Sequence, residues 1–238
     1  MKKVGLVLWL LVGLVVGASS QSREVVEGDS IPWELRKQSF IYNSAIMFND
    51  PIVARMALYN LLAENPGNVA LYDSLALSYL QYQKNASAAL VAQQAVQINP
   101  KDQFALEIAA TSFDQLGVKD RALSFYEKLQ LLNDDLNTLY KIAFLQLELD
   151  RYSEAATSVD IIKENPGSET LSIGFPKTDK SYQDVPLRAA AHRIKAMIAQ
   201  DKGETEEAKK LFLETLEMSP GFELVQIQLR ELTKKPAE

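Results

Sequence analysis

The chain has 238 residues, of which 47% are hydrophobic and 24% are charged, and its formal net charge at pH 7 is -6. This excess of acid argues against nucleic acid as the main partner, because binding to phosphates needs a basic stripe. The sequence contains no cysteine and a single histidine. It therefore excludes disulfides, thiolate zinc sites, a cysteine nucleophile and any metal site built from several histidines.

Residues 1–20 have the layout of a secretory signal peptide. Two lysines follow the first methionine, residues 4–17 form an unbroken run of apolar residues and glycine, and small residues come next. The run is shorter than the roughly 20 residues that a membrane-spanning helix needs. We therefore expect an exported, periplasmic protein in which a flexible segment, residues 21–32, follows the leader. The alternative is a membrane anchor formed by an uncleaved segment 4–18.

Two Asn-Pro steps, which end at Pro66 and Pro100, lie 34 residues apart. Aromatic, leucine and alanine residues recur at the same spacing: Tyr72, Leu75, Tyr79 and Ala88, and 34 residues later Leu106, Ala109, Phe113 and Ala122. The last clear match has its glycine, small residue, aromatic and proline at Gly203, Ala208, Phe212 and Pro220. This spacing resembles that of the tetratricopeptide repeat family, in which W-x2-L-G-x2-Y is followed by A-x3-F and a proline.

The resemblance implies an all-α fold, a right-handed superhelical α-solenoid of about five helix-turn-helix repeats. Repeats one to four would occupy residues 33–166, the fifth residues 187–221, and a C-terminal capping helix and tail residues 222–238. One helical hairpin cannot bury its own apolar face, so three or more must stack to form a continuous core.

Residues 167–186 interrupt the helical period with two glycines, two prolines and polar residues between them. We expect an irregular insertion loop, because no stretch of it carries a helical apolar stripe. A loop of this length is either a tolerated linker or a functional contact. In the second case, Phe175 and Tyr182 would be its exposed anchors, and the segment around Phe175 could pair as a strand with a partner.

Catalytic motifs are missing from the sequence: it holds neither a glycine-rich phosphate loop nor a GxSxG elbow. The paired carboxylates Asp134-Asp135 and Glu206-Glu207 stand where helices are expected to begin, where acid favours the helix dipole. His192 falls on a core-facing position and is expected to pack rather than to bind a metal or act as a base. The sequence therefore predicts no enzyme, no cofactor and no metal.

In the family, the first helix of each repeat lines a concave groove. The resemblance implies that the matching groove positions of this sequence are Arg36, Asn43, Asp73, Leu77, Phe104, Glu107, Thr111, Lys141, Leu145 and Arg193. Apolar members such as Leu77 and Leu145 fit an amphipathic helix or an extended segment of a partner, or they merely pack against neighbouring helices. Of the places that clamp a C-terminal carboxylate in one branch of the family, only Asn43 matches, which disfavours binding of chaperone tails.

We therefore expect a non-catalytic scaffold or adaptor in the bacterial cell envelope, with a protein or peptide in its groove. The alternative is an accessory or regulatory subunit of an envelope enzyme or secretion complex. Nucleic acid is not an expected partner, a membrane would be contacted only through an uncleaved leader, and the oligomeric state stays open.

Overall fold

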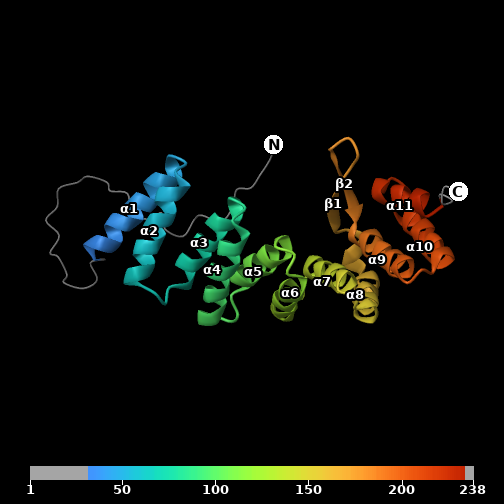
Figure 1. The fold of residues 1–238 in the computed structure, drawn as a ribbon, viewed down its shortest axis with the longest axis horizontal. Helices are drawn as coiled ribbons and strands as arrows, with labels where there is room; N and C mark the ends of the chain where they lie inside the picture. Colours follow the sequence, from blue (N-terminus) through green and yellow to red (C-terminus); the bar gives the residue numbers. More distant parts are fainter. Residues whose placement is uncertain (1–31, 234–238) are drawn as a thin grey trace.

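The computed structural model describes residues 32–233, and within this range the chain folds into eleven α-helices and one two-stranded sheet (Figure 1). The predicted signal peptide, residues 21–31 of the expected flexible segment and residues 234–238 lie outside the described residues. The helices are α1 (Trp33–Met47), α2 (Pro51–Glu64), α3 (Val69–Gln81), α4 (Asn85–Ile98), α5 (Gln103–Gln115), α6 (Lys119–Asn133), α7 (Leu136–Glu148), α8 (Tyr152–Glu164), α9 (Leu187–Asp201), α10 (Thr205–Met218) and α11 (Glu223–Thr233). None of the helices between Trp33 and Thr233 combines the length and the apolar character that crossing a membrane requires.

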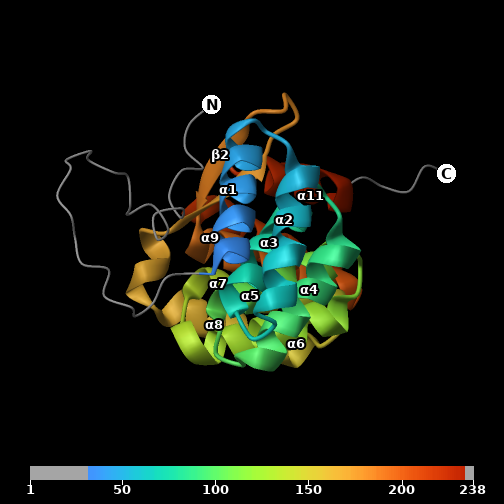
Figure 2. The same ribbon diagram turned by 90° about the vertical axis from the view of Figure 1, so that its left-hand side faces the viewer.

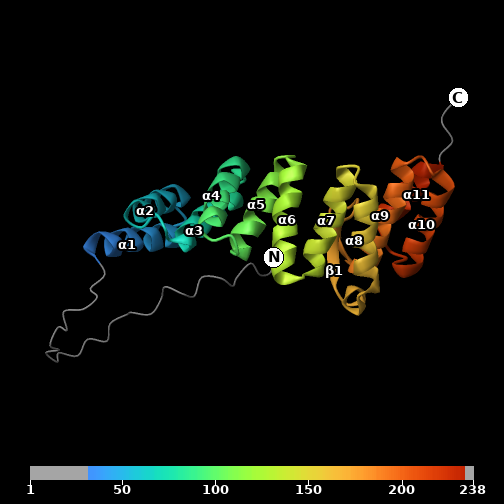
Figure 3. The same cartoon turned by 90° about the horizontal axis from the view of Figure 1, so that it is seen from below.

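The helices stack as consecutive hairpins along one axis. Each helix from α1 to α11 packs against the next one, with the sheet inserted between α8 and α9. Helix α3 also contacts α5, and α7 contacts α9, so the first helices of the hairpins form one layer of the solenoid (Figures 1 and 3). The predicted all-α solenoid of about five helical hairpins with a capping helix is confirmed.

The same backbone feature closes the first helix of every hairpin. A residue with a positive φ follows this helix at Asn49 (55°), Gln83 (55°), Gly117 (73°), Asp150 (58°) and Gly203 (75°). A left-handed residue satisfies the last carbonyl groups of a helix and reverses the chain, and glycine adopts this conformation without steric cost. The first four of these turns follow one another at intervals of 34, 34 and 33 residues, and the insertion lengthens the last interval to 53.

Small residues allow the helices to approach closely, as the repeat pattern predicts. Ala88, Ala110 and Ala122 are fully buried in a core cluster that runs from the first helix of the second hairpin to the first helix of the fourth. Phe113 stacks on Phe125 between α5 and α6, with ring centroids 5.6 Å apart. The close approach and the aromatic filling together make the core continuous from one hairpin to the next.

One helix start was predicted at the wrong residue. Asp134 ends α6 in a left-handed conformation, with φ at 47°. Asp135 is the residue that caps α7, since its carboxylate accepts a hydrogen bond from the Thr138 backbone N–H at 2.8 Å. An aspartate tolerates the left-handed region better than most residues do, so the pair serves one helix end and one helix start. Glu206 and Glu207 lie in the first turn of α10, as predicted.

The prediction of an irregular insertion is wrong. After a short 3-10 turn at Pro166–Glu169, residues 172–186 form an antiparallel hairpin of β1 (Ser172–Pro176) and β2 (Tyr182–Pro186). Ile173 lies opposite Val185, and Ile173, Phe175 and Val185 turn inward, whereas Ser172, Gly174, Pro176 and Asp184 are exposed and Pro186 is half-buried. This alternation has the two-residue period of a half-buried strand, which a search for helical periodicity does not detect.

Phe175 is therefore not an exposed anchor. Its ring is buried, 4.8 Å from the ring of Phe222 just before α11, and the Thr178 backbone N–H in the hairpin tip donates to Glu223 Oε1 at 3.1 Å. Tyr182 is 75% exposed, as predicted. The hairpin and α11 thus close the C-terminal end of the solenoid together.

Candidate functional site

The ten predicted groove residues all lie on the first helices of the five hairpins, α1, α3, α5, α7 and α9. Two hollows indent this layer, and each contains some of them. We call them the α7–α9 hollow and the α5–α7 hollow. Contact of any of these residues with a partner stays a prediction.

The α7–α9 hollow has a volume of about 330 Å³. Its lining comes from five elements and consists of Asp114, Tyr140, Lys141, Phe144, Leu145, Phe175, Arg193 and Leu224. It therefore unites Lys141, Leu145 and Arg193 of the predicted groove with Phe175 of the insertion. Its volume is within the range that holds a small ligand or one or two side chains of a peptide.

Arg193 is the polar residue at the bottom of this hollow. It is 6% exposed, its Nε donates to Gln228 Oε1 at 2.7 Å, and its guanidinium lies 5.9 Å from the centre of the Phe175 ring. Burial lowers the pKa of Arg193, and a hydrogen bond with Tyr140 opposes that shift. Burial also raises the pKa of the Tyr140 hydroxyl.

Within residues 32–233, the groups that contact the Arg193 guanidinium are all neutral, and no carboxylate stands at ion-pair distance from it. An arginine stays protonated even when buried. A buried charge without an opposite charge is energetically costly, and a carboxylate that entered the hollow would relieve that cost. The α7–α9 hollow is therefore suited to an anionic group.

Lys141 lies at the rim of the same hollow and joins α7 to the neighbouring hairpin. Its Nζ is 3.8 Å from Glu107 Oε1 and 5.1 Å from the centre of the Tyr126 ring. The Tyr126 hydroxyl is in turn 3.0 Å from Thr111 Oγ1. The structure thus brings three predicted groove residues, Glu107, Thr111 and Lys141, around one buried tyrosine. An exposed pair such as Lys141–Glu107 contributes little stability, so Lys141 can turn to an incoming anion at low cost.

The α5–α7 hollow is acidic, in contrast to the first. It has a volume of about 310 Å³ and lies where α5 and α7 begin and α6 ends. Its lining consists of Gln103, Phe104, Glu107, Leu129, Asn133, Asp135 and Thr138. Phe104 and Glu107 of the predicted groove both line this hollow, but none of its lining residues is basic, so it does not suit an anion.

Solved structures show what kind of fold carries these hollows. A tetratricopeptide repeat protein from Parabacteroides merdae matches 84% of this chain and 73% of its own length with a TM-score of 0.63 and 20% identity. MamA matches 86% of this chain and 98% of its own length, with a TM-score of 0.60 and 16% identity. YrrB, a TPR protein with an unusual peptide-binding site, matches 80% of this chain and 88% of its own length, with a TM-score of 0.63 and 12% identity.

The fold is that of the tetratricopeptide repeat proteins. At these identities, the likeness concerns the fold alone. No protein-family model matches the chain, and no curated protein matches it.

Not every groove position of this tetratricopeptide fold faces a hollow. Arg36 and Asn43 on α1 and Asp73 and Leu77 on α3 line neither of them. Leu77 packs against the core cluster and Leu145 belongs to it. These two leucines therefore pack against neighbouring helices, which was the second of the two interpretations of the apolar groove positions. Both hollows lie between α5 and α11.

Five lining or contacting residues of the α7–α9 hollow were missed by the sequence reasoning: Asp114, Tyr140, Phe144, Leu224 and Gln228. Leu224 and Gln228 belong to the capping helix α11, whose apolar residues were recognised but could not be placed against α7 and α9. Asp114 contacts Lys119 Nζ at 2.7 Å, and Glu148 Oε2 shares the same ammonium group at 3.0 Å, so one lysine pairs with two carboxylates beside the hollow. No short-range signal in the sequence links α11 to α7, because the two lie far apart along the chain.

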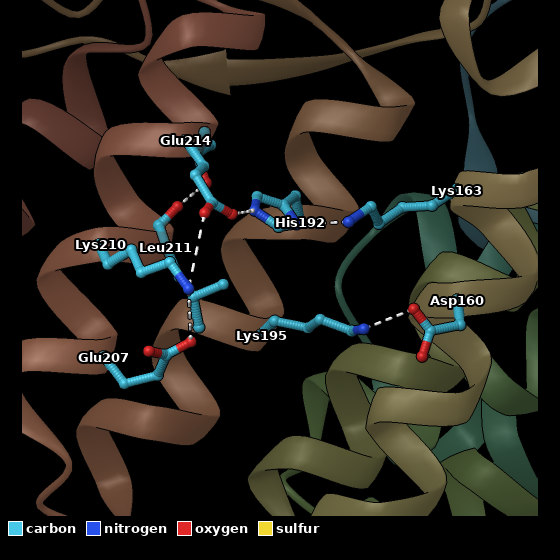
Figure 4. A network of polar contacts seen from close by, with 9 residues as sticks. Asp160, Lys163, His192, Lys195, Glu207, Lys210, Leu211 and Glu214 are labelled. Atoms are coloured by element: carbon cyan, nitrogen blue, oxygen red, sulfur yellow. Dashed lines mark hydrogen bonds and ion pairs between the residues drawn. The ribbon is translucent and has the colours of Figure 1, made fainter.

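The histidine at position 192 is a packed residue of this tetratricopeptide fold, as predicted, and it links three helices (Figure 4). Its Nδ1 is 2.9 Å from Lys163 Nζ on α8, and its Nε2 is 3.0 Å from Glu214 Oε2 on α10. Lys195 and Asp160 form an ion pair beside it. Because an ammonium group only donates, Nδ1 accepts, and the proton is assigned to Nε2, which donates to Glu214.

We expect His192 to make the protein less stable in weak acid. Burial and the nearby Lys163 ammonium lower the pKa of His192 below 6.5. Between the lowered value and 6.5, the unfolded chain binds more protons than the folded chain, so the free energy of unfolding falls as the pH falls through this window. Urea denaturation at pH 7.5 and 5.5 measures this, with His192→Gln as the comparison. The free energy of unfolding should fall less between pH 7.5 and pH 5.5 in the variant than in the unchanged protein. An equal fall in both would contradict the lowered pKa of His192.

Proposed function

We propose that this chain is a non-catalytic scaffold of the bacterial cell envelope that holds an acidic segment of a partner protein in its α7–α9 hollow. The observation that carries the proposal is the buried charge of Arg193, whose contacts within the described residues are all neutral. The leader-like pattern of residues 1–20 supports export.

The chemistry of the hollow indicates what the segment contains. The Arg193 guanidinium can donate two parallel hydrogen bonds to one carboxylate, and Lys141 adds a second positive charge at the rim. Phe144 and Leu224 give the hollow an apolar wall. The complementary ligand has a carboxylate next to a large aliphatic or aromatic side chain, presented from a helix or from an extended peptide.

Selection from a phage-displayed random peptide library on the purified chain tests the proposal. We expect the selected peptides to share an acidic residue beside a large apolar residue. Arg193→Met should weaken the dissociation constant of the best peptide by at least about tenfold, which corresponds to about 1.4 kcal/mol. Lys141→Met should have a smaller effect, because Lys141 is solvent-exposed and already has a partner in Glu107.

The matched control is Arg188→Met, which removes an arginine of the same helix that pairs with Glu169 outside the hollow. Calorimetric melting of each variant separates loss of binding from loss of folding. Peptides without an acidic residue would contradict the proposal. So would an affinity that is unchanged in a folded Arg193→Met variant.

A further inference from the structure

Six large apolar side chains of the first hairpin are more than half exposed. Trp33, Phe40, Met47, Phe48, Ile52 and Met56 are each 60–74% exposed. We call this surface the N-terminal face. Elsewhere in residues 32–233, apolar side chains that are more than 60% exposed are separate residues: Leu90 on α4, Leu131 on α6 and Tyr182 on β2. Scattered exposure of that kind is ordinary.

The spacing of the six residues places them along one side of α1, in the turn after it and along one side of α2. Trp33, Phe40 and Met47 follow one another at intervals of seven and therefore line one side of α1. Met47 and Phe48 lead into the turn, and Ile52 and Met56 continue the surface on α2 at an interval of four. Figure 2 views the solenoid from this end, with α1 and α2 in front of the other helices.

The face is large enough to bury a stable contact. An aromatic side chain buries about 150–250 Å² when covered, so six side chains exposed to this extent offer on the order of 700 Å². The largest apolar patch of a typical monomer is about 300–600 Å², and each partner in a standard interface buries about 800 Å². The N-terminal face is therefore above the range of a monomer surface and close to that of an interface.

The opposite end of the solenoid is closed. Phe222 and Val225 are fully buried, and Leu224, Leu229 and Leu232 pack inward against the same cluster. Terminal units of solenoids need a polar outer surface for solubility, and α11 supplies one at this end.

These observations decide which contact the face can make with a copy of itself. Head-to-tail stacking would require an apolar surface on α11, which is turned inward. A face-to-face contact instead joins two identical surfaces about a two-fold axis and closes, so that no filament can grow. The six residues are uncharged, and the charges nearby on α1 are mixed, with Glu34 and Lys37 3.8 Å apart. Two copies can thus meet without repulsion.

We propose that the protein forms a symmetric dimer in which the N-terminal faces of two copies cover each other. The two α7–α9 hollows then lie at the far ends of the dimer. Such a dimer would present two hollows to a partner with two acidic segments, which raises its avidity without any new contact in either hollow.

Sedimentation equilibrium of the purified chain, with and without residues 1–20, tests the proposal. We expect a dimer in both forms. Phe40→Glu combined with Met56→Glu should weaken the dimer on the order of a hundredfold, because removal of central apolar anchors has effects of this size. Leu90→Glu combined with Leu131→Glu is the matched control and should leave the dimer intact. Circular dichroism should show that both double variants remain folded.

Distances between spin labels test the two-fold symmetry. Because the chain has no cysteine, a label can be attached at one introduced cysteine alone. A spin label on Lys37→Cys, beside the face, should give a much shorter label-to-label distance within the dimer than a label on Glu231→Cys in α11. The proposal would be overturned by a monomer at every concentration or by a dimer that survives the Phe40→Glu and Met56→Glu changes. Association that requires residues 1–20, or two label pairs with the opposite order of distances, would overturn it as well. Binding of the face to lipid vesicles in place of a second copy would overturn it too.

Discussion

Replacing Phe222 by alanine is expected to destabilise the C-terminal part of the solenoid by about 3–5 kcal/mol, the usual cost of deleting a fully buried ring. Phe222 is completely buried, and its ring lies 4.8 Å from the ring of Phe175. This ring pair and the hydrogen bond from the Thr178 N–H to Glu223 both join the hairpin β1–β2 to the segment that carries α11. Without the ring, both should detach from α9 and α10, and the α7–α9 hollow should lose Phe175 and Leu224 from its lining.

Amide hydrogen exchange locates the effect, which matters because a solenoid can unfold in parts. We expect residues 172–186 and α11 to lose protection, while α3 to α6 keep theirs. Leu213→Ala on the neighbouring α10 is the matched control, since this side chain is more than half exposed and its loss should change stability by less than about 0.5 kcal/mol. Unchanged protection of the hairpin in Phe222→Ala would show that other contacts hold it.

Replacing Asp73 by asparagine is expected to stabilise the protein at pH 8. Burial of the carboxyl group, together with the charge of Asp102, raises the pKa of Asp73 from 3.8 to about 7. Its Oδ1 is buried and has no hydrogen-bond partner among residues 32–233. Between pH 3.8 and about 7, Asp73 therefore keeps its proton in the folded chain but has lost it in the unfolded chain. The stability from Asp73 is full below pH 3.8 and is lost as the pH rises to about 7.

Asparagine carries no charge at any pH, so the variant does not pay the cost of burying the Asp73 carboxylate. A shift of this size corresponds to about 4 kcal/mol for a fully buried group, but solvent reaches part of the Asp73 carboxyl group and screens it. We therefore expect a gain of about 1–2 kcal/mol at pH 8. Urea denaturation should show the gain shrinking as the pH is lowered from 8 towards 4. Asp184→Asn, at an exposed position of β2, is the control with little expected effect. A gain that does not depend on pH would contradict the assignment.

The repeat architecture could be predicted because its signals are local. Residues that close each first helix, such as Gln83 and Gly117, and small residues such as Ala88 and Ala122 recur at one spacing, and each acts on helices within one or two repeats of itself. Periodicity of 3.6 within a helix and of 34 between helices survives in the sequence without knowledge of distant contacts. The sequence therefore determined the helical hairpins, the capping helix and the layer on which the groove residues lie.

The candidate site was decided by contacts between distant segments. The α7–α9 hollow needs Asp114, Phe175 and Leu224 to meet, and no local pattern connects them. The burial of Phe175 follows from the two-residue alternation of β1 and from the arrival of Phe222. Whether Arg193 has a carboxylate beside it depends on which helices cover it. Local spacing specifies elements, whereas the environment of a buried charge depends on every element that packs around it, and only the tertiary structure supplies that environment.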